Sequence, residues 1–466
     1  MGLWAQARWW YRLAHVCQRW RNLILGSASY LRLTLYCTNG TPVQDMLLHS
    51  PPLPLTVDYH SEGGITVEDE EGILLALEQR HRVRHLHLVF AVQNMQKFVT
   101  EIDKEFQILE YLIVFTSPRS NTALVIPETF QAPRLHHLML EGFACPIRSP
   151  FHPTAVGLVT LFLTINRLSA YFQPNILLER ISSIPQLARF AIAFTFPVPS
   201  SDVERQLTHT PITAPITLPN LRLFSFQGIS VYLEAIICRI TTPRLENLQI
   251  QFFMQLTFSV PRLVQFINTT ENLRFDSAEI EFSNKRARLE TYVRETNALA
   301  FAIKVYCVHL DWQVASAAQF SNALSQVFAA VEHLTLQHEV HTNQSSEEHD
   351  DFDRVEWRNL LRPFNNVKTL GVEDRLVEEL SRCLQLGGGE LPLELLPELQ
   401  ELQCFGISDN STGDAFTSFI DSRNNAGRPV NLVCHNQSPS PSESFKLETP
   451  AIITSADGEA NDDLDT

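Results

Sequence analysis

Pro133-Arg134-Leu135-His136-His137-Leu138-Met139-Leu140 is the stretch that decides the fold, because its pattern returns along the chain. The pattern is Leu-x-x-Leu-x-apolar, usually with a proline just before it. Further copies, some with Val or Phe in a leucine position, occupy residues 109–114, 158–163, 187–192, 221–226, 245–250, 331–336, 367–372 and 399–404. About nine copies with the same internal spacing indicate a repeated structural unit.

Each copy is expected to be a strand that buries alternate side chains. Leu138 and Leu140 point inward, while His137 and Met139 point to the other face. One such strand cannot bury its apolar row alone, so neighbouring units must stack around a shared core. Apart from the longer gap between the copies at 245–250 and 331–336, consecutive copies are separated by an irregular distance of roughly 23 to 36 residues, which brackets and exceeds the ~20–29 of leucine-rich repeats. The expected fold is an α/β, leucine-rich-repeat-like solenoid (horseshoe) with irregular repeats.

Helices are expected between the strands. Residues 66–82 begin with a capping box at Thr66-Val67-Glu68-Asp69 and lead into a strand over 83–90. Further helices are expected at 175–184, 232–240, 261–269, 317–329, 374–386 and 415–423. The repeat register is lost at 273–310, where the strands contain less leucine.

Composition narrows the possible functions. The net charge is −16, from 36 basic and 52 acidic residues, which argues against a nucleic-acid partner. The eight cysteines contain no C-x-x-C pair, so they are interpreted as mostly buried thiols in a reducing compartment. The sequence shows neither a secretory signal nor an apolar run of the ~18 residues that a membrane span needs. We therefore expect an intracellular protein, cytoplasmic or nuclear, with no membrane partner.

No motif for catalysis or cofactor binding stands out. Gly387-Gly388-Gly389 has no following lysine and is interpreted as a helix stop rather than a phosphate loop. His85 and His87 share one strand face, but further zinc ligands are missing, so they are interpreted as surface histidines. The chain is expected to be neither an enzyme nor a holder of a metal or cofactor.

Residues 8–25 are expected to form one amphipathic helix in front of the array. Its apolar stripe consists of Leu13, Val16, Cys17, Trp20, Leu23 and Ile24, and arginines lie on the flanks. A helix at this position has two interpretations. It can cap the open end of the solenoid, since terminal units need a polar outer face, or it can dock on another protein.

Two groups of residues resemble a known family. Val16-Cys17-Gln18-Arg19-Trp20-Arg21-Asn22-Leu23-Ile24, followed by Tyr30-Leu31, resembles the last helix and exit of an F-box. The remainder resembles the degenerate leucine-rich-repeat body of F-box proteins from mushroom-forming fungi, in phrases such as Thr38-Asn39-Gly40-Thr41-Pro42-Val43 and Leu396-Pro397-Glu398-Leu399-Gln400-Glu401-Leu402. The Leu-Pro-x-Glu/Asp start of an F-box, about 20 residues upstream of the Cys-x-x-Trp helix, is missing.

The resemblance implies a division into three parts. Residues 1–30 are an F-box remnant, residues 31–434 the solenoid, and residues 435–466 a disordered acidic Ser/Pro tail. It also implies a substrate-recognition subunit of an SCF-type cullin–RING ubiquitin ligase, whose N-terminal stripe binds a Skp-type adaptor and, through it, a cullin. The alternative is a stand-alone repeat scaffold with no ubiquitin role.

A client protein is expected to bind the strand face that points away from the core. Tyr111, Ile113, Met139 and Phe162 lie on this face in adjacent units, and exposed apolar residues side by side mark a partner site. The alternative is that a helix, a loop or the C-terminal tail covers them.

Overall fold

The computed structural model describes residues 9–27, 31, 33–61, 64–116, 123–127, 129–144, 155–195, 215–253, 259–283, 285–307, 309–339, 354–385, 394–406 and 415–435. The disordered tail predicted for residues 435–466 lies outside this set, apart from its first residue. Within this set, no helix combines the length and the apolar character needed to cross a membrane.

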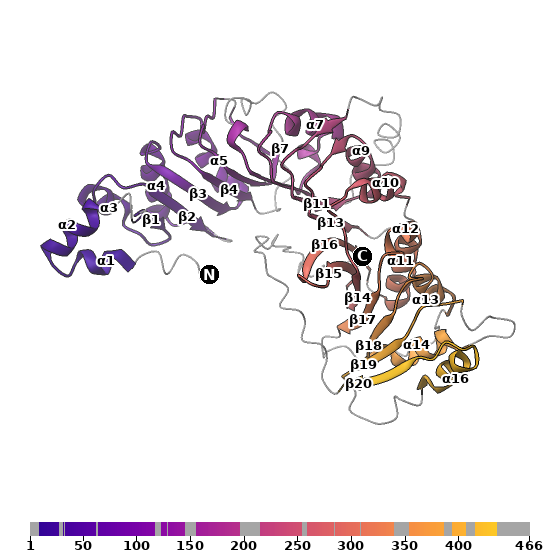
Figure 1. Ribbon diagram of the computed structural model, residues 1–466. Helices are drawn as coiled ribbons and strands as arrows, with labels where there is room; N and C mark the ends of the chain where they lie inside the picture. Colours follow the sequence, from indigo (N-terminus) through magenta and orange to yellow (C-terminus); the bar gives the residue numbers. More distant parts are fainter. Residues whose placement is uncertain are drawn as a thin grey trace, which may run out of the picture.

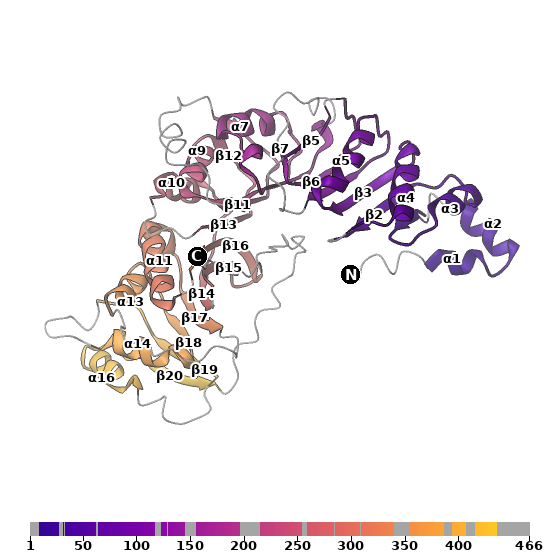
Figure 2. The ribbon, with the colours of Figure 1, turned by 180° about the vertical axis from the view of Figure 1, so that it is seen from behind.

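The chain is an α/β protein built on one long, mostly parallel sheet of sixteen strands. In Figure 1 the sheet follows an arc from the N-terminal to the C-terminal units, with helices along its outer side. The same arc appears from behind in Figure 2. In spatial order the strands are β1 (Leu35–Thr38), β2 (Leu55–His60), β3 (Val83–Phe90), β4 (Tyr111–Thr116), β6 (His137–Glu141), β8 (Thr160–Ile165), β9 (Arg189–Phe194), β11 (Leu223–Gly228), β13 (Asn247–Phe252), β16 (Ala298–Tyr306), β15 (Arg286–Val293), β14 (Ser277–Ser283), β17 (His333–Glu339), β18 (Thr369–Glu373), β19 (Glu401–Phe405) and β20 (Asn431–His435).

All nine copies of the leucine pattern are strands of this sheet, as predicted. On each side of the insertion between β13 and β17 their central residues are lateral neighbours: Leu112 pairs with Leu138, and Leu138 with Leu161. These leucines are almost fully buried and belong to one continuous core that runs along the array. The shared register explains the pattern, because every unit contributes its apolar row to the same spine.

The proline before many copies has a specific place in the structure. Leu135 N–H donates to the Ala132 carbonyl at 3.0 Å, so Pro133 is the second residue of a turn that leads into the strand. The same turn precedes Leu187, Leu221, Leu245 and Leu399, each with proline at this position. Proline favours it because the ring fixes φ near the value that the turn requires. The turn therefore closes each unit before its strand begins.

The region in which the register could not be followed contains an antiparallel insertion. The chain runs through β14, β15 and β16, and the spatial order is β13-β16-β15-β14-β17. β16 is parallel to β13 and β14 is parallel to β17, while β15 is antiparallel to both of its neighbours. β15 was not predicted, because charged residues (Arg286, Arg288 and Glu290) alternate with uncharged ones along it and the Leu-x-x-Leu pattern is absent.

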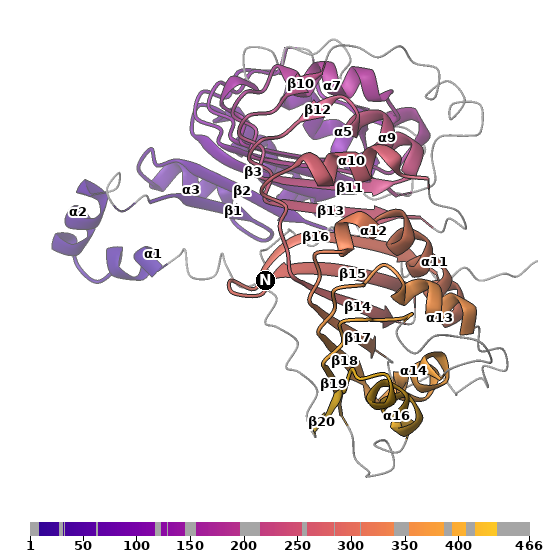
Figure 3. The ribbon, with the colours of Figure 1, turned by 45° about the vertical axis from the view of Figure 1, so that its right-hand side comes forward.

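Helices cover one face of the sheet, and Figure 3 shows several of them beside the stacked strands. They are α3 (Val43–His49), α4 (Val67–Glu78), α5 (Val92–Glu101), α7 (Pro174–Ser182), α9 (Ser230–Ile237), α10 (Pro261–Thr269), α11 (Leu310–Ala323), α12 (Ser325–Phe328), α13 (Arg354–Leu361), α14 (Val377–Leu384) and α16 (Thr417–Asn425). Thr66 caps α4 by accepting from Asp69 N–H at 3.1 Å, as the sequence predicted. α5 and α13 were not predicted, and α11 begins seven residues before the helix expected at 317–329.

The single N-terminal helix expected over residues 8–25 is wrong. The structure has two helices, α1 (Trp9–Ala14) and α2 (Gln18–Gly26). They are separated at Cys17, whose backbone is extended (φ −161°, ψ 169°) and precedes the first turn of α2. An extended residue interrupts the helical hydrogen bonds, so α1 and α2 are separate helices with different axes. Trp10 and Ile24 still bury 96% and 97% of their surfaces.

Candidate functional site

The face of the sheet opposite the helices carries the candidate site, and we call it the inner face. It consists of the strand side chains that alternate with the core leucines. No described helix covers it in the views of Figures 1 and 3. Two parts of it differ in chemistry, one near the N-terminal units and one on the antiparallel insertion.

The N-terminal part is an aromatic patch formed by His85, Tyr111, Ile113, His137 and Met139. Tyr111 lies between two histidines, with its ring centroid 4.7 Å from that of His85 and 4.2 Å from that of His137. The His137 ring is stacked on Tyr111 at 8°, whereas His85 meets it edge-on. These three residues are direct neighbours on β3, β4 and β6, so the register of the sheet produces the contacts.

Both histidines of the aromatic patch are shifted towards the neutral form. Burial, reinforced by the positive charge of Arg84, lowers the pKa of His85 to about 4. Burial also lowers the pKa of His137, with His136 and Arg189 acting in the same direction. Each ring has a hydroxyl partner: His85 Nδ1 is 3.3 Å from Thr56 Oγ1, and His137 Nδ1 is 3.0 Å from Thr160 Oγ1. The patch is thus an uncharged aromatic surface at neutral pH.

The structure brings the four predicted client-binding residues together, but not all are accessible. Ile113, Met139 and Phe162 are successive neighbours across β4, β6 and β8, and Tyr111 lies beside them, 37% exposed. Ile113 and Met139 are half-buried. Phe162 was expected to be exposed, and this is wrong: only 8% of its surface is accessible. The guanidinium of Arg189, on the next strand, lies over its ring at 5.6 Å.

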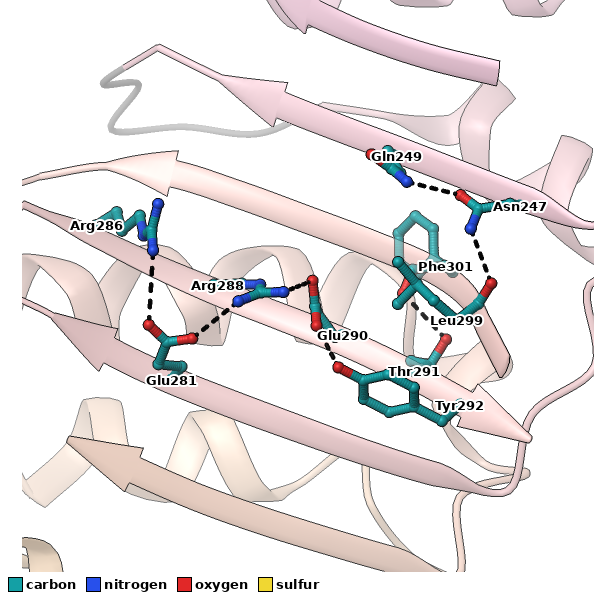
Figure 4. Close-up of polar contacts among 10 residues, drawn as sticks. All are labelled: Asn247, Gln249, Glu281, Arg286, Arg288, Glu290, Thr291, Tyr292, Leu299 and Phe301. Atoms are coloured by element: carbon teal, nitrogen blue, oxygen red, sulfur yellow. Dashed lines mark hydrogen bonds and ion pairs between the residues drawn. The ribbon is translucent and has the colours of Figure 1, made fainter. Parts of the chain in front are cut away.

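The second part of the inner face is a charged cluster on β14, β15 and β16. It consists of Glu279, Glu281, Arg286, Arg288, Glu290, Tyr292 and Lys304, most of which appear in Figure 4. Arg288 bridges two carboxylates: its Nη1 is 3.1 Å from Glu281 Oε2, and its Nη2 pairs with Glu290. Arg286 Nη2 also lies 3.8 Å from Glu281, and the Tyr292 hydroxyl donates to Glu290. Cations and hydroxyls thus satisfy Glu281 and Glu290 within the cluster.

Glu279 is the exception in the charged cluster. It lies directly opposite Glu290 in the register of β14 and β15, and like charges in this arrangement repel. Among the described residues, no hydrogen bond or ion pair ends on its carboxylate. Burial, followed by the repulsion from Glu290, raises the pKa of Glu279 to about 7. Lys304, on β16 opposite Arg288, has a lowered pKa, mainly because of burial and then because of Arg288.

Sequence reasoning missed this cluster and the ring stack around Tyr111. For the stack a signal existed: His85, Tyr111 and His137 each stand immediately before the central leucine of their unit. For the charged cluster no signal was read, because β15 had not been recognised as a strand. Of the described residues, no group of three or more His, Cys, Asp or Glu is arranged to hold a metal ion.

The predicted adaptor-binding stripe divides into exposed and buried halves. Val16, Trp20 and Leu23 are 62%, 45% and 63% exposed. Trp20 and Leu23 lie three residues apart on α2, whereas Val16 lies in the turn before Cys17 and α2. Cys17 is exposed next to them. Ile24 is 3% exposed and Leu13 is partly buried, and both pack against the core of the array. Only the exposed half is accessible to a partner.

Comparisons with known proteins add little. No protein-family model matches the chain, and no curated protein matches it. The chain is similar to the crystal structure of the leucine-rich repeat-containing protein LegL7 from Legionella pneumophila, at 10% identity, covering 83% of this chain and 97% of that one, with a TM-score of 0.27. A TM-score this low supports no conclusion about the fold or the function.

Proposed function

We propose that the chain is a leucine-rich-repeat-like solenoid that acts as a non-catalytic receptor and holds a client protein on its inner face. The observation that carries the proposal is the inner face itself, a long sheet surface without described helices on it. Its aromatic patch offers a flat, uncharged anchor around Tyr111. Aromatic side chains in such surroundings supply much of the binding energy of protein interfaces.

The charged cluster indicates what the client contributes. Among the described residues the Glu279 carboxylate makes no ion pair or hydrogen bond, and Arg288 offsets only part of the repulsion from Glu290, so a lysine or arginine of the client is the complementary group. Pairing with that cation would lower the pKa of Glu279 again, because an opposite charge favours the ionised form. The client segment we infer therefore has an apolar or aromatic anchor and a basic side chain.

The exposed half of α2 supports the more specific role of an SCF-type substrate receptor. Trp20 and Leu23 of α2, with Val16 in the turn before it, present apolar side chains to solvent, as the last helix of an F-box does towards a Skp-type adaptor. In this role the chain makes and breaks no bond. It would raise the effective concentration of client lysines near the ubiquitin-conjugating enzyme of the complex.

A second candidate is a scaffold without any ubiquitin link, and one observation favours it. Ile24, Leu13 and Trp10 pack on the first units of the array, so α1 and α2 also act as an end cap. A cap is required wherever a solenoid would expose its core at a terminal unit. The two candidates differ only in whether the exposed side of α2 binds an adaptor.

Two variants test client binding and adaptor binding separately. Tyr111→Ala combined with Met139→Ala should abolish capture of client proteins in a pull-down, and Trp312→Ala, which removes a 51% exposed aromatic on the outer helix α11, should not. Trp20→Ala should prevent co-purification with a Skp-type adaptor while client capture stays intact. Unchanged client capture by the Tyr111/Met139 variant contradicts the proposal that clients bind the inner face. If the parent chain does not bind an adaptor, the scaffold without a ubiquitin link is the supported function.

A further inference from the structure

The last two strands of the array place two cysteines side by side. Cys404 on β19 is the direct register partner of Cys434 on β20, and the strands are parallel. The two thiols are in hydrogen-bonding contact. Cys404 is 1% exposed, whereas Cys434 is exposed to solvent. No other two of the described cysteines are register partners in the sheet.

The geometry of neighbouring strands suits a disulfide. Adjacent strands lie about 4.8 Å apart, within the ~4.4–6.8 Å separation of Cα atoms that a disulfide requires. Both side chains lie on the same side of the sheet, because register partners in parallel strands point the same way. Little movement of the backbone is therefore needed to join the two sulfurs.

We propose that Cys404 and Cys434 form a reversible disulfide when the protein meets hydrogen peroxide, and that this bond fixes β20 to the array. The exposed Cys434 thiolate attacks one oxygen of the peroxide, which gives a sulfenic acid and releases the other oxygen as water after protonation. Cys404 then gives up its proton and attacks the Cys434 sulfur, and the sulfenic oxygen leaves as a second water. Two electrons pass from the two thiols to the peroxide, and a dithiol reductant reverses the bond.

The order of the two cysteines follows from their surroundings. Burial, with smaller contributions from Cys434 and Asp374, raises the pKa of Cys404 to about 12, so this thiol is a poor first nucleophile. Cys434 is the accessible one, and Cys404 waits beside it as the resolving thiol. A buried resolving partner also protects Cys434 from further oxidation, because the sulfenic acid is consumed in place.

The bond would act on a strand at the edge of the sheet. In the part of the chain that the structure describes, β20 has a neighbour on one side only, and most of its side chains are half-buried or exposed. Besides the strand ladder, its end is held by the His435 ring stacked on Phe405 at 5.3 Å and by the bond from Gly406 N–H to the His435 carbonyl at 3.1 Å. A covalent link between β19 and β20 suppresses fraying of this edge, where local unfolding is easiest.

Treatment of the full chain with hydrogen peroxide, followed by peptide mapping without reduction, tests the proposal. A cross-linked peptide pair containing Cys404 and Cys434 is expected, it should disappear with dithiothreitol, and amide exchange in β20 should slow about 100-fold while it is present. Cys434→Ser should abolish the pair, and Cys238→Ser, which removes another exposed cysteine, should leave it unchanged. Oxidation of Cys434 to sulfinic acid with Cys404 still free, or a pair formed with no change in β20 exchange, overturns it.

Discussion

Replacing Glu279 with glutamine should make the protein more stable and less able to bind its client. Burial and the opposing Glu290 raise the pKa of Glu279 to about 7, from an ordinary value of 4.5. Each unit of pKa corresponds to about 1.36 kcal/mol, which sets an upper bound of about 3 kcal/mol on the cost of ionising this carboxylate in the native state. Because the side chain is partly exposed and solvent screens the repulsion, we expect a gain of about 1 to 2 kcal/mol at pH 8.

The pH dependence has a definite direction. The native state holds the Glu279 proton more tightly than the unfolded chain does, so this residue makes the free energy of unfolding fall as the pH rises from about 4.5 to about 7. Above pH 7 its contribution is constant and unfavourable. Glutamine carries no charge at any of these pH values, so the Glu279→Gln variant should lack this part of the pH profile.

Urea unfolding of the parent chain and the variant at pH 5 and pH 8 measures the effect. Glu281→Gln is the matched control, since it removes a carboxylate that pairs with Arg288 and Arg286 and should destabilise the protein by roughly 0.5–2 kcal/mol. A Glu279→Gln variant less stable than the parent at pH 8 would refute the reasoning. If the Glu279→Gln variant is more stable but captures its client undiminished, the repulsion at Glu279 is confirmed. The proposal that a client cation pairs with Glu279 is then wrong.

Three further outcomes are expected. Gly142→Ala should cost at least about 3 kcal/mol in urea unfolding, because φ is +77° and the new Cβ would lie 1.9 Å from Thr116 Oγ1, whereas Gly40→Ala (φ +72°, open space) should cost only about 1 kcal/mol. The His85 ring should stay neutral in an NMR titration down to about pH 5, and since its pKa is lowered, it should make the native state less stable as the pH falls from 6.5 towards 4. Ile24→Ala should lower the free energy of unfolding by about 2–5 kcal/mol, while Leu23→Ala on the exposed side of α2 should change it by less than about 0.5 kcal/mol.

The sequence predicted the strands well because their signal is local. Leu135, Leu138 and Leu140 are read from one short window, and the turn that Pro133 forms is set by the same residues. The features that it missed depend on distant residues. Phe162 has the pattern of an inner-face residue, yet Arg189, from the next strand, covers it.

The antiparallel insertion was missed for a related reason. β15 alternates charged and apolar residues, and its Arg288 pairs with Glu281 on the neighbouring β14, while it has no leucine row of its own. The division of the N-terminal apolar stripe into exposed and buried residues was also not visible in the local sequence. Periodicity placed Leu23 and Ile24 on one surface, but a break at Cys17 decides which of the two faces the array.

The connectivity of the insertion limits where such a chain can be truncated or extended. β16 comes later in the chain than β14 but is seated on β13, and α11 then carries the chain back across the insertion to β17. Gln313 of α11 links the end of β14 to the end of β16, because its side-chain amide donates to the carbonyls of Ser283 and Cys307 at 2.6 and 2.9 Å. Elsewhere in the array one unit can be gained or lost by itself, whereas here three strands and their helix must be exchanged as a block. A fragment ending between β14 and β16 would leave β13 without its lateral neighbour, so the two arms of the arc cannot be separated cleanly at this seam.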